Sequence, residues 1–169
     1  MKLNIVILTI SDTRTQETDK SGVYLCNAVQ EADHVIQGYE IIPDDFAIIV
    51  NTMEKYCQDP QVDVILSTGG TGITARDVTP EALKEVADIM IDGFGELFRW
   101  ISFQSIGTST VQSRACAGVH NGTLLFALPG STGACKDAWT GILHQQLNIH
   151  HRPCNFAQLL PRLANAKRV

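Results

Sequence analysis

Three glycines, Gly69, Gly70 and Gly72, stand within four residues and are followed by Arg76 and Asp77. Glycines spaced in this way let the backbone adopt positive φ and turn its N–H groups toward one point, which makes a concave anion site. A carboxylate beside such a site would repel phosphate, so Asp77 needs another purpose. It can hold a metal ion or accept hydrogen bonds from the N–H edge of a heterocycle. The alternative is a tight structural turn in which Arg76 pairs with Asp77 and nothing binds.

The glycine-rich stretch differs from two better-known phosphate loops. It has no Gly-Lys-Ser/Thr, which excludes the loop that binds nucleoside triphosphates. Its spacing also departs from G-x-G-x-x-G, which excludes the dinucleotide-binding fingerprint. The chemistry of this loop must therefore be inferred from its neighbours.

A buried strand and a helix flank the glycines. The apolar, β-branched run from Val62 to Leu66 predicts a strand that is buried on both faces. On the other side, Thr79 can cap a helix, Pro80 suits its first position and Glu81 falls in its first turn. The glycines thus connect the end of a strand to the start of a helix.

Other polar loops follow predicted strands in the same way. Apolar runs at 3–10 and 35–42 predict two more strands, and Asn121-Gly122 between apolar runs 114–119 and 123–128 predicts a hairpin. Helical periodicity begins near Asp19 or Ser21 and recurs at 46–56, 94–103 and after Ser131. The loops that follow strands are Ser11–Arg14, Pro43–Asp45, Ser67–Thr79 and Pro129–Gly133.

Alternation of strands and helices predicts an α/β fold in three layers. We expect a doubly wound, mostly parallel sheet with one antiparallel strand from the hairpin and helices on both faces. Ligands of such sheets bind beyond the carboxyl ends of the strands, where the four loops should meet. We expect one domain over 1–169, with 150–169 as a C-terminal tail that wraps a neighbouring chain or the domain itself.

Composition narrows the classes of partner. A hydrophobic content of 44%, a charged content of 18% and a net charge of −5 indicate a globular protein without a broad nucleic-acid footprint. The apolar run Ile5–Ile10 is too short for a signal peptide or a membrane span, so we expect a cytoplasmic protein. The five cysteines form no C-x-x-C pair and are expected to be buried free thiols. The five histidines have no ligand spacing.

The segment from Ser67 to Ala82, STGGTGITARDVTPEA, resembles the signature of the MoaB/MogA-type molybdopterin-binding family of molybdenum cofactor biosynthesis. The resemblance extends over nearly the whole chain and is strongest for the family's protein B branch. It includes Ser11–Arg14 with Asp19–Gly22, Pro43–Asp45, Thr108–Ala115, Leu128–Ser131 and Arg152–Phe156. One departure is Thr132, where the adenylyltransferase relatives commonly carry proline.

The resemblance implies that molybdopterin and MgATP react to adenylylated molybdopterin and pyrophosphate. It implies that Asp44 is catalytic and binds Mg²⁺, although Asp44 can also be read as a helix N-cap. Asp77 would hold the pterin or the magnesium. The glycines would present N–H groups to the terminal phosphate, Arg76 would compensate charge, and Ser131 with the helix start behind it would form a second anion point. The implied substrate-binding residues are Ser11, Asp12, Arg14, Thr68, Gly69, Gly70, Thr71, Gly72, Arg76, Ser109, Ser113, Gly130 and Ser131.

Two other functions compete with the adenylyltransferase. One is a carrier that holds molybdopterin or a purine nucleotide with little turnover, and the other is a nucleotide-dependent regulator on a Rossmann-like domain. The missing dinucleotide fingerprint argues against the regulator only. The aromatic helix 94–103, the tail and the resemblance together predict a trimer or a pair of trimers. The resemblance also allows contacts with other proteins of the pathway, whereas neither nucleic acid nor membrane is expected as a partner.

Overall fold

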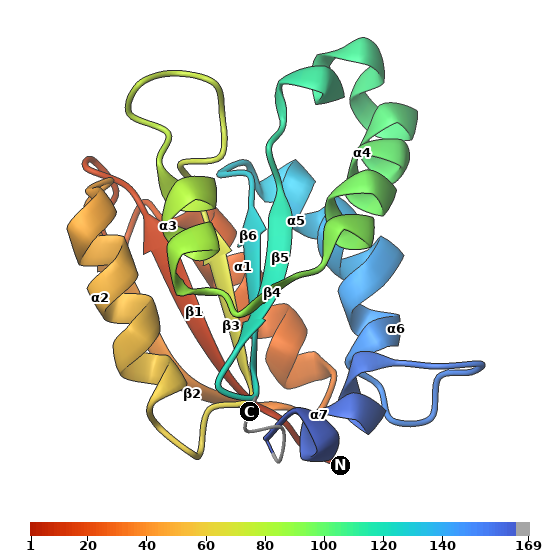
Figure 1. Ribbon diagram of the computed structural model, residues 1–169. Coiled ribbons are helices and arrows are strands. Elements are labelled where there is room, and N and C mark those ends of the chain that lie inside the picture. The colour runs from red at the N-terminus through yellow and green to blue at the C-terminus, as the bar shows by residue number, and fades with distance from the viewer. Residues whose placement is uncertain (165–169) are drawn as a thin grey trace.

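The computed structural model describes residues 1–164, which form one sheet with helices on both sides (Figure 1). Strands and helices alternate as the apolar pattern predicts, and the two runs beside Asn121-Gly122 form the expected hairpin. In chain order the elements are β1 (Asn4–Ile10), α1 (Lys20–Glu31), β2 (Val35–Ile42), α2 (Phe46–Cys57), β3 (Val64–Thr68), α3 (Thr79–Val86), β4 (Ile89–Met90), α4 (Asp92–Ile106), the 3₁₀-helix η1 (Gly107–Gln112), β5 (Cys116–His120), β6 (Thr123–Leu128), α5 (Thr132–Ala138), the π-helix η2 (Trp139–Leu143), α6 (His144–Gln146) and α7 (Phe156–Ala164).

The sheet has six strands in the order β2-β1-β3-β6-β5-β4. The pairs β1/β2, β1/β3 and β3/β6 are parallel, whereas β5 is antiparallel to both β6 and β4. The predicted mostly parallel sheet with one antiparallel strand is therefore confirmed. The sequence pattern did not predict β4, because a strand of two residues is too short to show a period.

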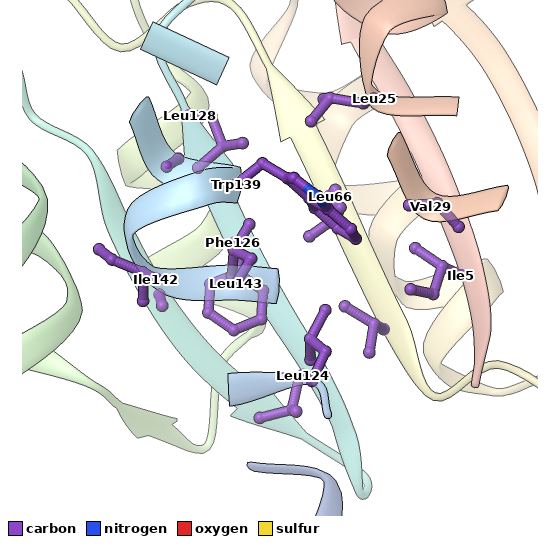
Figure 2. Packing of buried hydrophobic residues seen from close by; sticks show 14 of the residues in the cluster. Ile5, Leu25, Val29, Leu66, Leu124, Phe126, Leu128, Trp139, Ile142 and Leu143 are labelled. Carbon is purple, nitrogen blue, oxygen red and sulfur yellow. The ribbon is translucent and has the colours of Figure 1, made fainter. Parts of the chain in front are cut away.

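Each central strand is buried on both faces because helices cover both sides of the sheet. Ile5 and Ile7 of β1 belong to one apolar cluster, and Val6 and Leu8 belong to the other. Successive side chains of a strand point to opposite faces, so this division follows from the pleat. The first cluster packs under α1, α4, α5 and α7, and the second packs under α2 and α3. In Figure 2, Trp139 of η2 lies among the side chains of the first cluster.

Helix α4 runs through Gly93 and Gly95 and extends beyond the predicted range 94–103 at both ends. A Cβ at Gly95 would lie 2.5 Å from the carbonyl oxygen of Ala115, so this glycine lets α4 pack directly against the start of β5. Phe94 and Phe98 of α4 are buried in the first apolar cluster. The same helix therefore has a core face and an outer face.

The C-terminal tail contains a helix that packs on the domain itself. Ala157 and Leu160 of α7 are buried in the first apolar cluster. Of the predicted tail, 165–169 lie outside the described residues. Within 1–164 none of the helices is long and apolar enough to cross a membrane.

Candidate functional site

The four loops predicted to converge do meet at one edge of the sheet. Strand register places Ile10 beside Ile42, and Thr68 beside both Thr9 and Leu128, so β1, β2, β3 and β6 end at nearly the same level. The first residues beyond the strands remain hydrogen-bonded: the N–H of Gly69 donates to the Leu128 carbonyl at 3.0 Å. Figure 1 shows the loop after β3 standing above this edge. The register of the sheet therefore brings the four loops together at one edge.

The three glycines of the loop serve two different purposes. Gly69 (φ +113°) and Gly70 (φ +63°) adopt the left-handed conformation that a Cβ disfavours. A Cβ at Gly69 would also strike the carbonyl oxygen of Ile10. Gly72 has an ordinary φ, but a Cβ there would lie 2.7 Å from Oδ2 of Asp77. The expected positive φ thus holds at two positions, and the third glycine makes room for a carboxylate.

Thr79 fastens the loop and does not cap α3 as predicted. The structural cap residue is Val78, which makes no side-chain hydrogen bond to the helix. Thr79 is the first helical residue, and its buried hydroxyl donates to the Gly69 carbonyl at 2.9 Å, while its N–H donates to the Gly70 carbonyl at 3.1 Å. These two bonds fix the peptide groups on either side of Gly70.

The candidate anion site has fewer free N–H donors than the three glycines suggest. The Gly69 N–H is used by Leu128, and the Gly72 N–H bonds to the carboxylate of Asp77. Within residues 1–164, the N–H groups of Gly70 and Thr71 donate to no protein acceptor. An anion would therefore be bound by two consecutive peptide N–H groups.

Asp77 is bound by its own loop and not by Arg76. Its Oδ2 accepts from the N–H (2.9 Å) and the hydroxyl (2.7 Å) of Thr74. Burial raises the pKa of Asp77, but the hydrogen bonds from Thr74 and Gly72 and the charge of Arg114 leave that pKa below its ordinary value. Arg76 pairs with Asp12 instead. The alternative of a structural turn in which Arg76 pairs with Asp77 is therefore wrong on this contact.

Asp44 carries a carboxylate oxygen that has no partner. Its Oδ1 is buried and accepts no hydrogen bond from the described residues. Burial raises the pKa of Asp44, the N–H of Val78 lowers it and the negative charge of Asp77 raises it, so the pKa lies above its ordinary value. The alternative of Asp44 as a helix N-cap is wrong, because Asp45 caps α2 by accepting from the Ile48 N–H at 3.0 Å. The Asp44 carboxylate therefore accepts from the Val78 N–H and still leaves Oδ1 without a donor.

The chemistry around Asp44 fits a cation that is completed by ligand oxygens. A buried oxygen without a donor is the group that a hard divalent cation would satisfy. The described part of the chain has no group of three His, Cys, Asp or Glu side chains placed to hold a metal ion by themselves. Magnesium keeps several waters and often binds through one or two carboxylates together with substrate phosphates. Asp44 therefore suits magnesium that arrives with a nucleotide.

A hollow of about 470 Å³ opens beside Asp44. Acidic groups and Arg76 form its polar side, and apolar side chains at the start of α2 form the other. The Asp44 N–H donates to Oδ1 of Asp12 at 3.2 Å, which ties the loops after β1 and β2 together. The residues that line the hollow are Asp12, Pro43, Asp44, Asp45, Phe46, Ile48, Ala75, Arg76 and Val78.

Arg14 is a brace between loops and is held by the buried carboxylate of Asp19. Its Nη2 donates to the Gly130 carbonyl at 2.7 Å, and its Nη1 pairs with the fully buried carboxylate of Asp19 at 3.3 Å. Burial raises the pKa of Asp19, but hydrogen bonds from Thr9, Tyr39 and its own helix start lower that pKa below its ordinary value. Nothing in the spacing of these residues reveals this network, because its members come from separate elements.

Three other predicted residues lie around this edge in different roles. Thr68 is buried and donates to the Pro129 carbonyl at 2.9 Å, so it links the end of β3 to the loop after β6. Ser11 accepts from the Arg14 N–H at 3.1 Å, and Ser131 accepts from the Ala134 N–H at 3.1 Å as the cap of α5.

The two serines beyond α4 differ in position. Ser109 is exposed on η1 and makes no hydrogen bond to the glycine loop. Ser113 adjoins Arg114, whose backbone N–H donates to the Thr71 carbonyl at 3.0 Å. The structure thus places Ser113 next to the site and leaves Ser109 apart from it.

Fold and site together define an α/β domain with a candidate ligand site at the carboxyl edge of its sheet. The family model described as "Probable molybdopterin binding domain" matches residues 6–149. The chain belongs to this molybdopterin-binding family of molybdenum cofactor biosynthesis.

The similar proteins share the family and nearly the whole length. Molybdenum cofactor biosynthesis protein B of Escherichia coli K12 is 49% identical over 152 residues, which cover 90% of this chain and 89% of the relative. Its counterpart in Halalkalibacterium halodurans is 45% identical over 143 residues, or 84% of each chain.

A crystal structure of molybdenum cofactor biosynthesis protein B superimposes with a TM-score of 0.88 at 40% identity, covering 98% of both chains. The structure of the tungsten cofactor synthesizing protein MoaB from Pyrococcus furiosus gives 0.79 at 29% identity, covering 96% of this chain and 98% of that one. The fold expected from the resemblance is confirmed.

Proposed function

We propose that this protein binds molybdopterin and adenylylates it with MgATP. The observation that carries the proposal is the buried, unpartnered Oδ1 of Asp44 beside a loop with two free peptide N–H groups. The unpartnered carboxylate oxygen favours a cation, and the free peptide N–H groups favour an anion. A metal-bound nucleotide supplies both. Membership of a molybdopterin-binding family supports molybdopterin as the second substrate.

In the proposed reaction an oxygen of the molybdopterin phosphate attacks the α-phosphorus of ATP. A new phosphoanhydride bond forms, the bond from the α-phosphorus to the bridging oxygen breaks, and pyrophosphate leaves with the electron pair. Such transfers depend mainly on positioning and on neutralising charge, so no nucleophilic side chain is needed. The preorganised backbone of the loop is suited to that task.

We assign each residue a role in binding the phosphate, the pterin or the cation from the contacts that it makes. Gly70 and Thr71 would donate to a terminal phosphate, and Arg76 would leave Asp12 to compensate its charge. Asp77, fixed by Thr74, would accept from the N–H edge of the pterin or hold the cation. Asp44 would hold Mg²⁺, which when bound neutralises phosphate charge.

Calorimetric titrations of Asp44→Asn and Asp77→Asn test the assignment. Asp44→Asn should bind molybdopterin normally and lose magnesium-dependent ATP affinity, because only the charge that attracts the cation is removed. Asp77→Asn should weaken molybdopterin binding by about 1–3 kcal/mol, since the new amide N–H would face hydrogen-bond donors from which the carboxylate accepts. Equal loss of molybdopterin binding in both variants would contradict the division of labour, and no loss in either would place the site elsewhere.

A carrier without turnover is the second candidate, and two observations favour it. Thr132 stands where adenylyltransferase relatives commonly carry proline, and the relatives at 45–49% identity are named protein B. Incubation with MgATP and molybdopterin separates the candidates. Pyrophosphate release with an adenylylated product supports the enzyme, whereas tight binding without either product supports the carrier.

We also propose that the protein self-associates as a trimer or a pair of trimers through the outer face of α4. Trp100 is 66% exposed, and Leu97, Phe103 and Ile106 on the same helix are also exposed. Contiguous exposed apolar side chains of this size mark interaction surfaces. Sedimentation velocity should show an oligomer that Trp100→Glu dissociates. A monomer at micromolar concentration in the unmodified protein would overturn this part.

A further inference from the structure

Arg114 reaches across both ends of the ligand loop and is not among the site residues that the resemblance implies. Its Nε donates to the Gly72 carbonyl at 2.6 Å, and its Nη2 donates to the Asp77 carbonyl at 2.5 Å. Its backbone N–H donates to the Thr71 carbonyl at 3.0 Å. The third nitrogen, Nη1, pairs with Glu81 on α3. One side chain therefore holds the point where the loop leaves the glycines and the point where it returns.

The loop between these two points has no core of its own. Residues 73–76 are all exposed, and Ile73 is 69% exposed. Exposed segments without buried apolar contacts open easily, so hydrogen bonds must define this shape. Three sets of bonds do so: the Asp77 carboxylate binds Thr74 within the loop, Arg76 pairs with Asp12, and Arg114, just before β5, binds the flanking carbonyls.

We propose that Arg114 is a positioning residue for the ligand site, which clamps loop 72–77 so that Asp77 and the Gly70–Thr71 N–H groups keep the geometry that binds the ligand. The loop part of this inference stands on the contacts alone, and its consequence for binding rests on the proposed function. A guanidinium can serve this purpose because its planar fork donates in two fixed directions, which a lysine ammonium does not reproduce.

The antiparallel direction of β5 makes the clamp possible. Because β5 runs against β6, its first residues, and not its last, lie at the ligand edge. Arg114 therefore enters beside the loop from the start of a strand, and its side chain is 34% exposed. It also lines a cleft of about 380 Å³ between α3 and α4, through which small solutes can reach it.

Limited trypsin digestion measures the clamp without any ligand. The peptide bond after Arg76 lies inside the clamped loop and has the same sequence around it in every variant. Its intrinsic rate of cleavage therefore cancels when a variant is compared with the unmodified protein. Mass spectrometry would follow fragments 1–76 and 77–169. Arg114→Lys should speed this cleavage by about tenfold, because at least one charged hydrogen bond to the loop is lost.

Two matched variants and a rescue control the measurement. Arg99→Lys is an equal change nearby, but Arg99 donates to Ser113 and Ala115 and not to the loop. Glu81→Gln removes only the ion pair to α3. Both should cleave within about twofold of the unmodified protein. In Arg114→Ala, guanidinium chloride at tens of millimolar should restore protection after Arg76, whereas sodium chloride should not.

The binding test uses MgATP and molybdopterin on the same proteins. Arg114→Lys should lose about tenfold in affinity with a thermal midpoint close to that of Arg99→Lys. Unchanged cleavage after Arg76 in Arg114→Lys, or faster cleavage with unchanged affinity, would overturn the positioning role. If the unmodified protein binds neither ligand, the proposed function fails, and the digestion still decides whether the clamp exists.

Discussion

Replacing Asp44 by Asn should make the ligand-free protein more stable while it removes the proposed metal ligand. In the unmodified protein, Oδ1 is buried without a partner and the carboxylate faces the negative charge of Asp77. A buried polar group left unsatisfied costs about 1–3 kcal/mol. An amide keeps the shape and carries no charge, so we expect a gain of about 1 kcal/mol, the low end of that range, since Asn still has to place its own donors.

The gain should depend on pH with a defined sign. The pKa of Asp44 in the folded state lies above its ordinary value of 3.8. The folded state therefore holds the proton longer than the unfolded state, and this group's contribution to stability falls as pH rises through that folded pKa. The advantage of Asp44→Asn should accordingly be larger at pH 7.5 than at pH 4.5, where the unmodified carboxylate is partly protonated.

Thermal unfolding at fixed protein concentration, in buffer with a chelator and no nucleotide, measures this effect. A gain of about 1 kcal/mol corresponds to a rise of roughly 2–4 °C for a chain of this size. Asp45→Asn is the matched control, because Asp45 is exposed and Asn caps a helix as well as Asp. A variant of Asp44 that is less stable than the unmodified protein at both pH values would refute the argument that this carboxylate is unsatisfied.

Three further predictions follow from single contacts. Gly70→Val should fold with a loss of about 1–2 kcal/mol, since its φ of +63° is left-handed, and should lose ligand binding in calorimetry; unchanged affinity would make the loop a mere turn. Arg14→Ala should cost about 3 kcal/mol or more in urea unfolding, because the buried Asp19 loses its cation, and a loss below 1 kcal/mol would contradict that role. Cys154 is the exposed thiol, whereas burial raises the pKa of Cys57 to about 12, so a thiol reagent should modify Cys154 first, as peptide mapping would show.

The architecture was predictable because apolar patterning and strand ends determine it. Continuous apolar runs predicted the parallel strands, and polar loops after those strands predicted the ligand edge before any contact was known. The hairpin was predictable from Asn121-Gly122, both of which have positive φ. These features depend on neighbours in the sequence, and β4 escaped prediction because its pairing depends on neighbours in space.

Partner choice among polar side chains was not predictable for the same reason. Adjacent side chains such as Arg76 and Asp77 point in different directions, so Asp77 binds within its loop while Arg76 reaches Asp12, 64 positions away. Thr79 was assigned to its own helix, yet its hydroxyl turns back to the Gly69 carbonyl. Arg114 lies 42 positions from Gly72, and its role could be seen only after the sheet had brought β5 beside the loop.

The brace between Arg14 and the Gly130 carbonyl joins positions 116 residues apart, which has a consequence for the protein while it is being made. A chain emerging from the ribosome has its first loop, its second loop and its glycines long before it has Gly130, so the incomplete chain has strands without a closed ligand edge. Contacts of such separation form late, because loop closure must come first. Products of premature termination before residue 130 would therefore lack the site, and retention on an immobilised ligand would separate finished chains from unfinished ones.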